Sequence, residues 1–320
     1  MRPFEPLFSN PHVLTILGNF WPREYDFSRF PMESRFVRTD EDTQVLVQKQ
    51  RPLAAPVGET VLLHGLEGNG ESGYIRSMAW DALQAGFIVH RFHMRTCGGT
   101  AEQCKTLYHA GLTSDLRVFL EGRRGSGLPL FLIGFSLGGN VALKLAGELG
   151  ETDLIEGVCA ISTPIDLAAG VRRIGALENR LYERRFLKRM RARLLATGRY
   201  KREELEAART LYEIDDRITA PSFGFEGADH YYATQSAQIY LDRIRVPTLL
   251  IQAKDDTFIP FEMYGHPAIS SNPYIRLVAT ERGGHLGFLA RRGPRFWVDE
   301  IALDFLKNLA LTATQASHTR

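Results

Sequence analysis

This chain of 320 residues contains only three cysteines, and no two of them form a CxxC pair. Disulfide scaffolds and structural zinc sites need cysteines in pairs or in larger sets at short spacings. The small, odd number therefore argues against both kinds of structure. It is typical of a protein that works in a reducing compartment, so we expect a cytoplasmic protein.

The sequence also lacks an uninterrupted apolar run of about 18 residues, which a transmembrane helix would require. Residues 1–23 have no clean apolar core followed by a small-residue cleavage site, so we expect no signal peptide. Charges nearly balance, because 39 lysines and arginines accompany 37 aspartates and glutamates and leave a net charge of +2. Since nucleic-acid binding needs a strongly basic surface, we expect no nucleic-acid partner.

Short apolar runs alternate with amphipathic segments through the first half of the chain. Strands that are buried on both faces and separated by helices are typical of parallel βαβ units. The sequence therefore predicts an α/β protein with a mostly parallel, doubly wound sheet. We expect strands at 59–64, 87–92, 129–133, 155–161, 247–253 and 274–279, and helices at 72–85, 112–123, 140–149 and 296–309.

Residues 165–245 differ from this pattern, because glycines and β-branched runs become sparse and leucines fall at helical spacings. We expect this segment to be a helical cap, inserted late in the sheet of a core formed by residues 1–164 and 246–320. Four apolar positions of the cap are predicted to face inward over the active site: Leu177, Leu181, Leu187 and Met190.

The predicted cap is strongly basic at residues 172–202, where twelve arginines and lysines accompany only Glu178 and Glu183. The simplest interpretation is solvated helix faces that also meet the acidic remainder of the chain, and we expect this basic stretch to face outward. Alternatively, it would attract an anionic or lipid-like substrate, or bring the protein into peripheral contact with a membrane surface.

Two glycine-rich motifs compete for the active site. The first, at residues 68–73, has the GxGxxG pattern that dinucleotide-binding folds place directly after a strand. Here residues 64–67 separate the motif from the predicted strand, and the next strand does not end in the acid that would bind a ribose. Because the pattern alone is weak, we expect no nucleotide and no other cofactor.

The second motif, at residues 134–138, reads GFSLG and matches GxSxG. It follows the most apolar predicted strand and precedes a helix-forming run, which is the context of a nucleophile elbow. The chain must reverse there within a few residues, and side chains at both ends would collide with neighbouring backbone. The helix that begins here also presents free N–H groups to a developing negative charge. Ser136 is therefore the predicted nucleophile.

A serine hydroxyl needs a base, and the base needs a carboxylate behind it. After a nucleophile elbow, the acid and the histidine follow the serine in that order. His285 lies in a glycine-rich turn after a predicted strand, where a short loop can bring the ring to the edge of the sheet. His230 lies in the cap, His266 precedes a proline, and His318 lies in the tail. We therefore expect His285 to be the base.

Two adjacent aspartates follow the predicted strand at 247–253. We favour Asp256 over Asp255 as the acid, because Asp256 lies four residues before a proline. Asp166, after the preceding strand, is a third candidate. Adjacent acids also allow one to serve in the triad while the other caps the next helix.

Two backbone N–H groups are expected to hold the oxyanion of a tetrahedral intermediate. One belongs to Leu137, directly after the nucleophile, and the other to Leu66, in the loop after the first strong strand. Tyr231 and Tyr232 are candidate pocket residues, although two aromatic residues in the core of the cap would give the same pattern. The sequence has no HExxH motif and no tight cluster of histidines and acids, so we expect no metal site.

With these motifs in view, the sequence resembles the α/β-hydrolase superfamily, and more narrowly its YheT-like branch, AB hydrolase family 4. The similar segments, in order along the chain, are residues 10–18, 20–23, 64–74, 134–140, 229–232, 253–256 and 283–288. The resemblance implies the α/β-hydrolase fold, a triad of Ser136, Asp256 and His285, and activity on carboxylic esters. Relatives include lipid esterases and medium-chain ester-forming acyltransferases, so the substrate does not carry over.

One loop departs from the family pattern. Where we expect N-x-R-G-C-G-G, residues 93–99 read HMRTCGG, with histidine and threonine in place of asparagine and glycine. The departure affects the loop beside the active site and not the triad. Cys97, in the same loop, has no base close in sequence, so we expect a packed thiol and not a nucleophile.

The leading hypothesis is a serine esterase that cleaves a small-molecule ester with a short to medium acyl chain through an acyl-enzyme. One alternative is an acyltransferase with the same triad, in which an alcohol replaces water. Another is a non-catalytic pseudo-hydrolase that binds a lipid. The intact order of Ser136, Asp256 and His285 argues against the last, because a binding module does not need all three.

Overall fold

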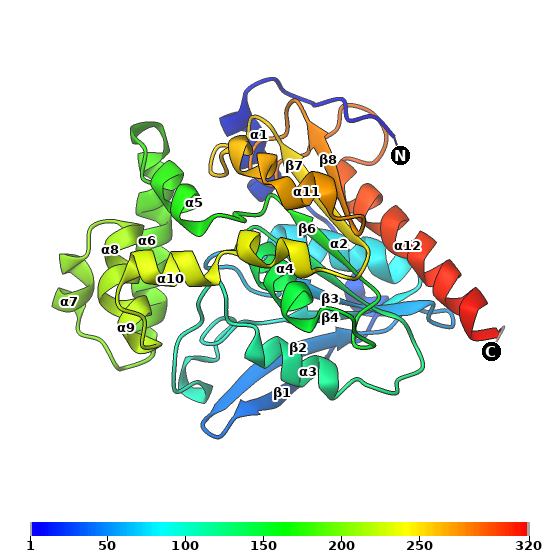
Figure 1. The fold of residues 1–320 in the computed structure, drawn as a ribbon, viewed down its shortest axis with the longest axis horizontal. Coiled ribbons are helices and arrows are strands. Elements are labelled where there is room, and N and C mark those ends of the chain that lie inside the picture. Colours follow the sequence, from blue (N-terminus) through cyan, green and yellow to red (C-terminus); the bar gives the residue numbers. More distant parts are fainter. Residues whose placement is uncertain (1, 319–320) are drawn as a thin grey trace.

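The computed structural model describes residues 2–318 of the chain, with side chains up to residue 313. Its centre is one sheet of eight strands in the order β1-β2-β4-β3-β5-β6-β7-β8. Figure 1 shows that helices cover both faces of this sheet. The strands are β1 (Glu33–Asp40), β2 (Thr43–Gln50), β3 (Gly58–Leu63), β4 (Phe87–Phe92), β5 (Leu130–Phe135), β6 (Gly157–Ile161), β7 (Thr248–Ala253) and β8 (Ile275–Thr280).

The strands from β3 to β8 pair in parallel. All positions of β3 to β7 are buried, as their continuous apolar runs predicted. The sequence analysis expected each of these parallel strands, and no strand end differs from its expected position by more than two residues. The α/β class and the mostly parallel sheet are therefore confirmed.

β1 and β2 form an antiparallel hairpin at one edge of the sheet, which the sequence analysis missed. β1 is exposed at most positions, and β2 alternates between buried and half-buried residues. Neither strand has the continuous apolar run by which the parallel strands were found. The hairpin joins the rest of the sheet where β2 pairs antiparallel with β4.

Two hydrophobic layers hold the helices against the sheet. One joins α2 (Gly73–Gln84) and α12 (Trp297–His318) to one face. The other lies under α3 (Ser114–Glu121), α4 (Leu137–Leu149) and α11 (Pro267–Ser271) on the opposite face. All four expected helices are present, although α12 continues past residue 309, where we expected it to end. Within residues 2–318, no helix is both long and apolar enough to cross a bilayer.

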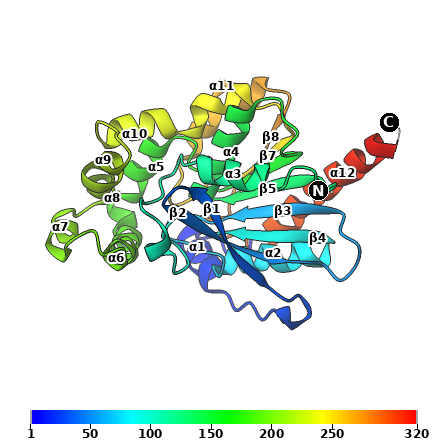
Figure 2. The same cartoon turned by 90° about the horizontal axis from the view of Figure 1, so that it is seen from below.

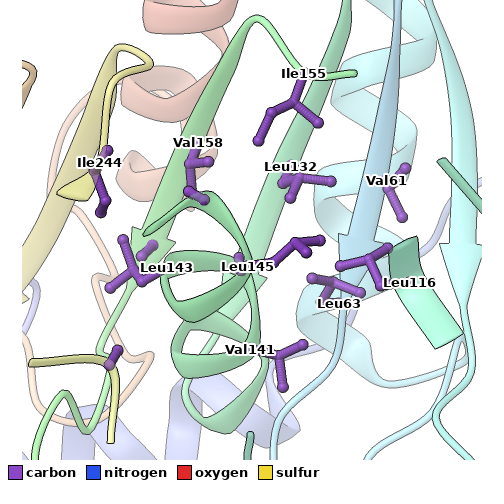
Figure 3. Close-up of a cluster of buried hydrophobic side chains, with 14 of the residues drawn as sticks. Val61, Leu63, Leu116, Leu132, Val141, Leu143, Leu145, Ile155, Val158 and Ile244 are labelled. Carbon is purple, nitrogen blue, oxygen red and sulfur yellow. The ribbon is translucent and has the colours of Figure 1, made fainter. Parts of the chain in front are cut away.

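α4 is central to the second layer (Figure 3). Its side chains Val141, Leu143 and Leu145 lie among those of Leu132 and Val158 from the sheet. Because these side chains are fully or almost fully buried, the helix cannot shift without exposing apolar surface. The layer therefore fixes the first turn of α4, which follows Ser136 directly.

Between β6 and β7 the chain forms a series of helices, which we call the helical segment. Figures 1 and 2 show it at one end of the sheet, away from the C-terminal end of α12. Two apolar clusters, which also include Leu107 and Ala110 from outside the segment, hold it together. Its elements are α5 (Leu167–Ile174), η3 (Leu177–Asn179), α6 (Arg180–Ala196), α7 (Arg202–Ala207), α8 (Leu211–Ile214), η4 (Asp215–Thr219), α9 (Ala220–Ser222), α10 (Ala228–Gln235) and η5 (Ala237–Arg243). The remaining elements of the chain are α1 (Pro11–Phe20), η1 (Phe27–Arg29), η2 (Ala101–Gln103) and η6 (Phe261–Gly265).

The prediction that four apolar residues of this segment face inward is wrong for two of them. Leu187 and Met190 are buried, but Leu177 and Leu181 are exposed. Positions 181 and 187 are separated by about 600° of helical rotation, so they cannot share a face of α6. The inward position at the start of α6 is taken by Asn179, whose side chain is fully buried.

The prediction that the basic stretch faces outward is also wrong in part. Arg193 points inward, and only 11% of its side chain is exposed. It forms a salt bridge at 2.8 Å with Glu67, which lies in the loop after β3. The pairing accounts for the burial, since a charged side chain is rarely buried without a partner.

Candidate active site

Ser136 lies at a sharp turn between β5 and α4. Its backbone has φ 52° and ψ −122°, a strained conformation for a residue with a side chain. The flanking glycines are required by close approaches: a Cβ on Gly134 would lie 2.5 Å from the carbonyl oxygen of Gly138. A Cβ on Gly138 would lie 2.6 Å from that of His64. The turn therefore holds the Ser136 side chain out at the carboxyl edge of the sheet.

His285 joins Ser136 to Asp256. Its Nε2 lies 3.1 Å from Ser136 Oγ, and its Nδ1 lies 3.0 and 3.1 Å from the two carboxylate oxygens of Asp256. The side chains of His285 and Asp256 are buried. If Nδ1–H donates to Asp256, Nε2 is left to accept the serine proton. The structure thus brings together the three residues that the sequence analysis put forward.

The Asp256 carboxylate is held by further donors. Its Oδ1 accepts hydrogen bonds from the backbone N–H groups of Phe258 (2.8 Å) and Ile259 (3.1 Å). Its Oδ2 accepts from Gln252 Nε2 at 3.2 Å. These bonds hold the carboxylate in position against His285.

Asp255 and Asp166 have other partners. Asp255 accepts the backbone N–H of Gly284 at 2.9 Å, so it holds the turn that carries His285. Desolvation raises the pKa of Asp255. The expectation that the second acid caps the next helix is wrong, because Pro260 occupies the N-cap position of η6. Asp166 caps α5 by accepting from the N–H of Ala169 at 3.0 Å.

Two of the other candidate histidines, His230 and His266, have partners away from Ser136. His230 accepts the backbone N–H of Glu226 at 3.2 Å. His266 caps α11 by accepting from the N–H of Ala268 at 3.2 Å. The side chain of His318 lies outside the described residues.

α1 supports the histidine turn, and the sequence analysis did not find this contribution. The backbone N–H of His285 donates to Thr15 Oγ1 at 2.9 Å. The Thr15 hydroxyl in turn donates to the carbonyl of Pro11 at 2.7 Å, which orients its lone pair toward His285. Only the family resemblance had drawn attention to residues 10–18, because a buried threonine in a short helix has no signal of its own in the sequence.

The loop after β3 runs beside the serine. A Cβ on Gly65 would lie 3.0 Å from Ser136 Cβ, so the backbone itself approaches the nucleophile. The N–H groups of Gly65 and Glu67 donate to the hydroxyls of Tyr74 (3.0 Å) and Tyr108 (2.9 Å). The N–H of Leu66 lies between them in the chain. Leu137 is the first residue of α4, where a backbone N–H has no partner within its own helix.

Glu67 ties this loop to the helical segment. Its carboxylate accepts hydrogen bonds from Arg193 Nε at 2.9 and 3.0 Å and from the Tyr108 hydroxyl at 3.1 Å. Its carbonyl accepts from Arg189 at 2.6 Å. Arg193 also donates to Thr96 Oγ1 at 2.8 Å. Thr96 is the threonine that departs from the family pattern, and it keeps the positive φ (63°) that favours glycine.

Two cavities meet at Ser136, and both are also lined by Leu66, Phe186 and Phe258. One, of about 140 Å³, extends between α1 and α6 and is bordered by Tyr74, Arg185 and Arg189, among others. The other, of about 70 Å³, extends under the helical segment and is almost entirely apolar. Its further lining residues include Leu137, Val171, Ile174, Met190, Tyr231 and Tyr232.

Tyr231 and Tyr232 are therefore both buried aromatic residues of the helical segment and lining residues of the apolar cavity. Their hydroxyls are engaged, since Tyr231 accepts the N–H of Ala110 (2.8 Å) and Tyr232 donates to Asp215 (2.7 Å). Asp215 also lines the cavity, and desolvation raises its pKa to about 6.

The surroundings of His64 and Cys97 favour structural roles over catalytic ones. Desolvation lowers the pKa of His64 to about 4, and its Nε2 accepts the N–H of Met94 at 3.1 Å. Desolvation raises the pKa of the buried Cys97 thiol to about 12, which disfavours a thiolate nucleophile. Across the described part of the chain, no group of three or more histidines, cysteines or acids is arranged to hold a metal ion.

A family model described as the alpha/beta hydrolase family matches residues 60–296. The chain belongs to this family. The match spans most of the chain, from β3 to the start of α12, and so includes Ser136, Asp256 and His285. Among curated proteins, this α/β hydrolase is 32% identical to the "Putative esterase YheT" of Escherichia coli, over 93% of this chain and 91% of that protein. The narrower resemblance to the YheT-like branch is thereby confirmed.

Two yeast proteins are more distant relatives of this α/β hydrolase. A monoacylglycerol lipase of Saccharomyces cerevisiae is 28% identical over 77% of this chain and 58% of the relative. A medium-chain fatty acid ethyl ester synthase/esterase of the same yeast is 26% identical over 90% of this chain and 67% of the relative. Among solved structures, a Pyrococcus furiosus esterase matches with a TM-score of 0.59 at 17% identity, covering 96% of this chain and 99% of that one. At this identity the match supports the fold alone.

Proposed function

We propose that this α/β hydrolase is a serine hydrolase that cleaves carboxylic esters through an acyl-enzyme on Ser136 Oγ. The observation that carries the proposal is the unbroken chain of contacts from Asp256 through His285 to Ser136, at 3.0 and 3.1 Å. Relatives described as esterases and a lipase support the ester as the substrate class.

In the proposed mechanism, His285 Nε2 takes the proton of Ser136 as Oγ attacks the ester carbonyl carbon. Asp256 keeps the imidazole oriented and stabilises its charged form. The tetrahedral intermediate collapses, the alcohol leaves with the proton from His285, and the acyl group remains on Ser136. Water, activated by the same histidine, then releases the acid and restores the serine. The sequence of steps uses no metal and no cofactor.

The oxyanion of each intermediate would accept hydrogen bonds from the backbone N–H groups of Leu66 and Leu137. Support comes from the close approach of the loop at Gly65 to Ser136 and from the free N–H positions at the start of α4. The dipole of α4 adds partial positive charge at the same point.

We assign the acyl chain to the apolar cavity and the alcohol to the cavity between α1 and α6. In this assignment residues 165–245 act as a cap on a core of residues 1–164 and 246–320, and Tyr231 and Tyr232 are pocket residues. The apolar lining favours a hydrocarbon chain over a compact polar group. The modest volume of about 70 Å³ favours short to medium chains.

Acyl transfer to an alcohol is the second candidate function, since one relative is described as an ethyl ester synthase as well as an esterase. Both reactions share the acyl-enzyme and differ only in the acceptor. Product analysis with added ethanol distinguishes them: ester formed in preference to free acid, at low alcohol concentration, would assign the transferase.

The direct test is hydrolysis of p-nitrophenyl butyrate by Ser136→Ala and His285→Ala variants. Each should lose activity by a factor on the order of 10⁶, because the serine and its base act as a unit. Unchanged circular dichroism would show that the fold is intact. A Ser136→Ala variant with wild-type turnover would exclude this serine as the nucleophile.

A further inference from the structure

α1 has an unusual surface for a helix at the edge of a globular protein. Its ten residues include no charged side chain. Leu14, Thr15 and Gly18 face the body of the protein, while Val13, Ile16 and Phe20 are exposed on the other side. A surface helix normally turns polar residues outward. α1 instead presents an apolar stripe to solvent.

A second exposed apolar group lies where η3 leads into α6. Leu177 is 84% exposed and Leu181 is 75% exposed, and at a spacing of four residues they lie on one side. The chain is held firmly here, because Asn179 donates to the carbonyls of Thr257 (2.6 Å) and Arg173 (2.9 Å). The fixed turn therefore holds both leucines away from the core.

The two groups lie on elements that meet beside the active site. The rings of His12 and Tyr182 stack with centroids 5.8 Å apart, and Arg185 lies over the ring of Phe20 at 5.2 Å. Figure 1 shows the turn between α5 and α6 on the same side of the molecule as α1. We call the five exposed residues the apolar rim: Val13, Ile16, Phe20, Leu177 and Leu181. Two of its members, Ile16 and Phe20, line the cavity that leads to Ser136.

Cations on α6 flank this rim. Arg180, Arg184, Arg185 and Lys188 are exposed on α6. Within residues 2–318, none of these four forms a salt bridge with an acidic side chain. Because the net charge of the whole chain is only +2, this is a local concentration of unpaired positive charge. Apolar side chains flanked by cations complement the headgroup region of an anionic bilayer.

We propose that the apolar rim and the cations that flank it dock the protein onto an anionic phospholipid bilayer. The five apolar side chains enter the boundary between headgroups and acyl chains, and the arginines and Lys188 pair with lipid phosphates. The mouth of the cavity then faces the membrane, so that a lipid ester reaches Ser136 from the bilayer. This last consequence rests on the proposed ester hydrolysis, whereas the docking itself does not.

The test is co-sedimentation with vesicles of phosphatidylcholine alone and with vesicles that also contain phosphatidylglycerol. The protein carries Ser136→Ala, so that no lipid is consumed and failure of the esterase proposal leaves the result unaffected. Two substitutions are added, Leu177→Ser with Leu181→Ser. The matched control is Leu53→Ser with Leu311→Ser, which removes two leucines of similar exposure (63% and 65%). Leu53 lies between β2 and β3, before the amino end of β3, and Leu311 lies in α12, which Figure 1 shows pointing away from the helical segment.

We expect binding to the anionic vesicles, reduced at least about tenfold by the Leu177 and Leu181 substitutions and unchanged in the control. Arg180→Gln with Arg184→Gln should reduce binding several-fold at low salt, on the order of 0.05 M, and hardly at 0.5 M. With Ser136 restored, the leucine variant should still hydrolyse a soluble short-chain ester within about twofold of the unsubstituted enzyme, because neither leucine lines the cavity.

Three results would overturn the proposal. Absence of binding to anionic vesicles would refute docking, and equal loss in the Leu53 and Leu311 control would refute the role of the rim. Sedimentation velocity gives the third: a dimer that the Leu177 and Leu181 substitutions abolish would assign the rim to a second copy of the chain.

Discussion

Ser136, His285 and Asp256 come from three separate turns, each of which follows a parallel strand of the sheet. Each turn is fixed by short contacts: Gly134 and Gly138 at the serine, Asp255 at the histidine, and backbone N–H groups at the acid. The geometry of this candidate triad is therefore fixed by the turns themselves. Preorganisation of this kind is what a serine–histidine pair requires.

The two adjacent aspartates should differ sharply in their contribution to activity. Asp256→Asn is expected to lower kcat by about 10⁴, because an amide leaves His285 in the wrong tautomer. Asp255→Asn should lower it by less than about tenfold, because the amide oxygen can still accept the N–H of Gly284. Steady-state hydrolysis of p-nitrophenyl butyrate measures both variants. The reverse order of effects would move the acid to Asp255.

At the scale of residues, much of the candidate site could be predicted from the sequence. The GxSxG context, the glycine-rich histidine turn and the chain order predicted Ser136 and His285, whose side chains the structure places 3.1 Å apart. Asp255 and Asp256 could only be ranked, because neighbouring residues point in different directions according to local dihedral angles that no spacing rule contains. Thr15 was missed, since its partner is a backbone N–H 270 residues away in the chain.

At the scale of elements, α6 contributes to two different features. One side carries Arg189 and Arg193, which bind Glu67 in the loop after β3, and another side carries Leu181 of the apolar rim. In the proposed mechanism this loop supplies the N–H of Leu66. The contacts of Arg189 and Arg193 with Glu67, which we call the clamp, would then couple the helical segment to the oxyanion site.

Arg193→Met should therefore lower kcat by about 10 to 100-fold with little change in KM for a small ester. Loss of a whole oxyanion donor costs about 10²–10³, and displacement of a donor costs less. Arg193→Lys should retain more activity than Arg193→Met, because it keeps the positive charge, although it loses the bidentate geometry of the contact with Glu67. Kinetics and the free energy of unfolding are measured together, because an unpaired Glu67 also destabilises the fold.

Arg191→Met is the matched control for this clamp. Arg191 lies on the same helix and donates to the carbonyls of Leu205 (3.1 Å) and Ala208 (2.7 Å), within the helical segment. If its loss lowers kcat as much as Arg193→Met does, the effect belongs to the stability of the helical segment and not to the loop.

The apolar cavity predicts a chain-length profile for the acyl group. From acetate upward, each added methylene should raise kcat/KM up to about fourfold until the cavity is full. Val171→Phe should shift the optimum to a shorter chain, because Val171 lines the cavity. Val118→Phe, on the exposed side of α3, is the control. A profile that is flat or falls from acetate would refute the assignment of this cavity to the acyl chain.

Periodicity predicted the parallel strands and the helices between them, because burial on both faces leaves continuous apolar runs. It did not predict the β1–β2 hairpin, whose residues are largely exposed, nor the outward direction of Leu177 and Leu181. Helical spacing shows which residues share a face but not which way that face points, and here the buried Asn179 decides the direction.

At the scale of the whole molecule, the two layers of the core bury groups that titrate far from their ordinary range. Asp299 of α12 is buried and accepts the Ser77 hydroxyl at 2.5 Å. Desolvation and the nearby charge of Asp81 raise the pKa of Asp299 well above its usual range. The folded state therefore binds this proton more tightly than the unfolded chain does, and the stability it contributes is lost as the pH rises above about 4.

Asp299→Asn should remove this dependence. Relative to the variant, the wild type should lose up to about 1.4 kcal/mol of unfolding free energy per pH unit between pH 5 and the raised pKa of Asp299. Urea denaturation across this range measures the difference. Asp304→Asn, an exposed aspartate on the same helix, should follow the wild type at every pH. A constant difference between wild type and Asp299→Asn would contradict the assignment.

The main proposal for this protein is that Ser136 is the nucleophile of an acyl-enzyme, activated by His285. Its most direct test is to label the folded protein with an ester-like fluorophosphonate and map the adduct by peptide mass spectrometry. We expect one stoichiometric adduct, on Ser136, that forms at least about 10³ times more slowly in His285→Ala. Stoichiometric labelling of another residue, or labelling of Ser136 at an unchanged rate without His285, would contradict it.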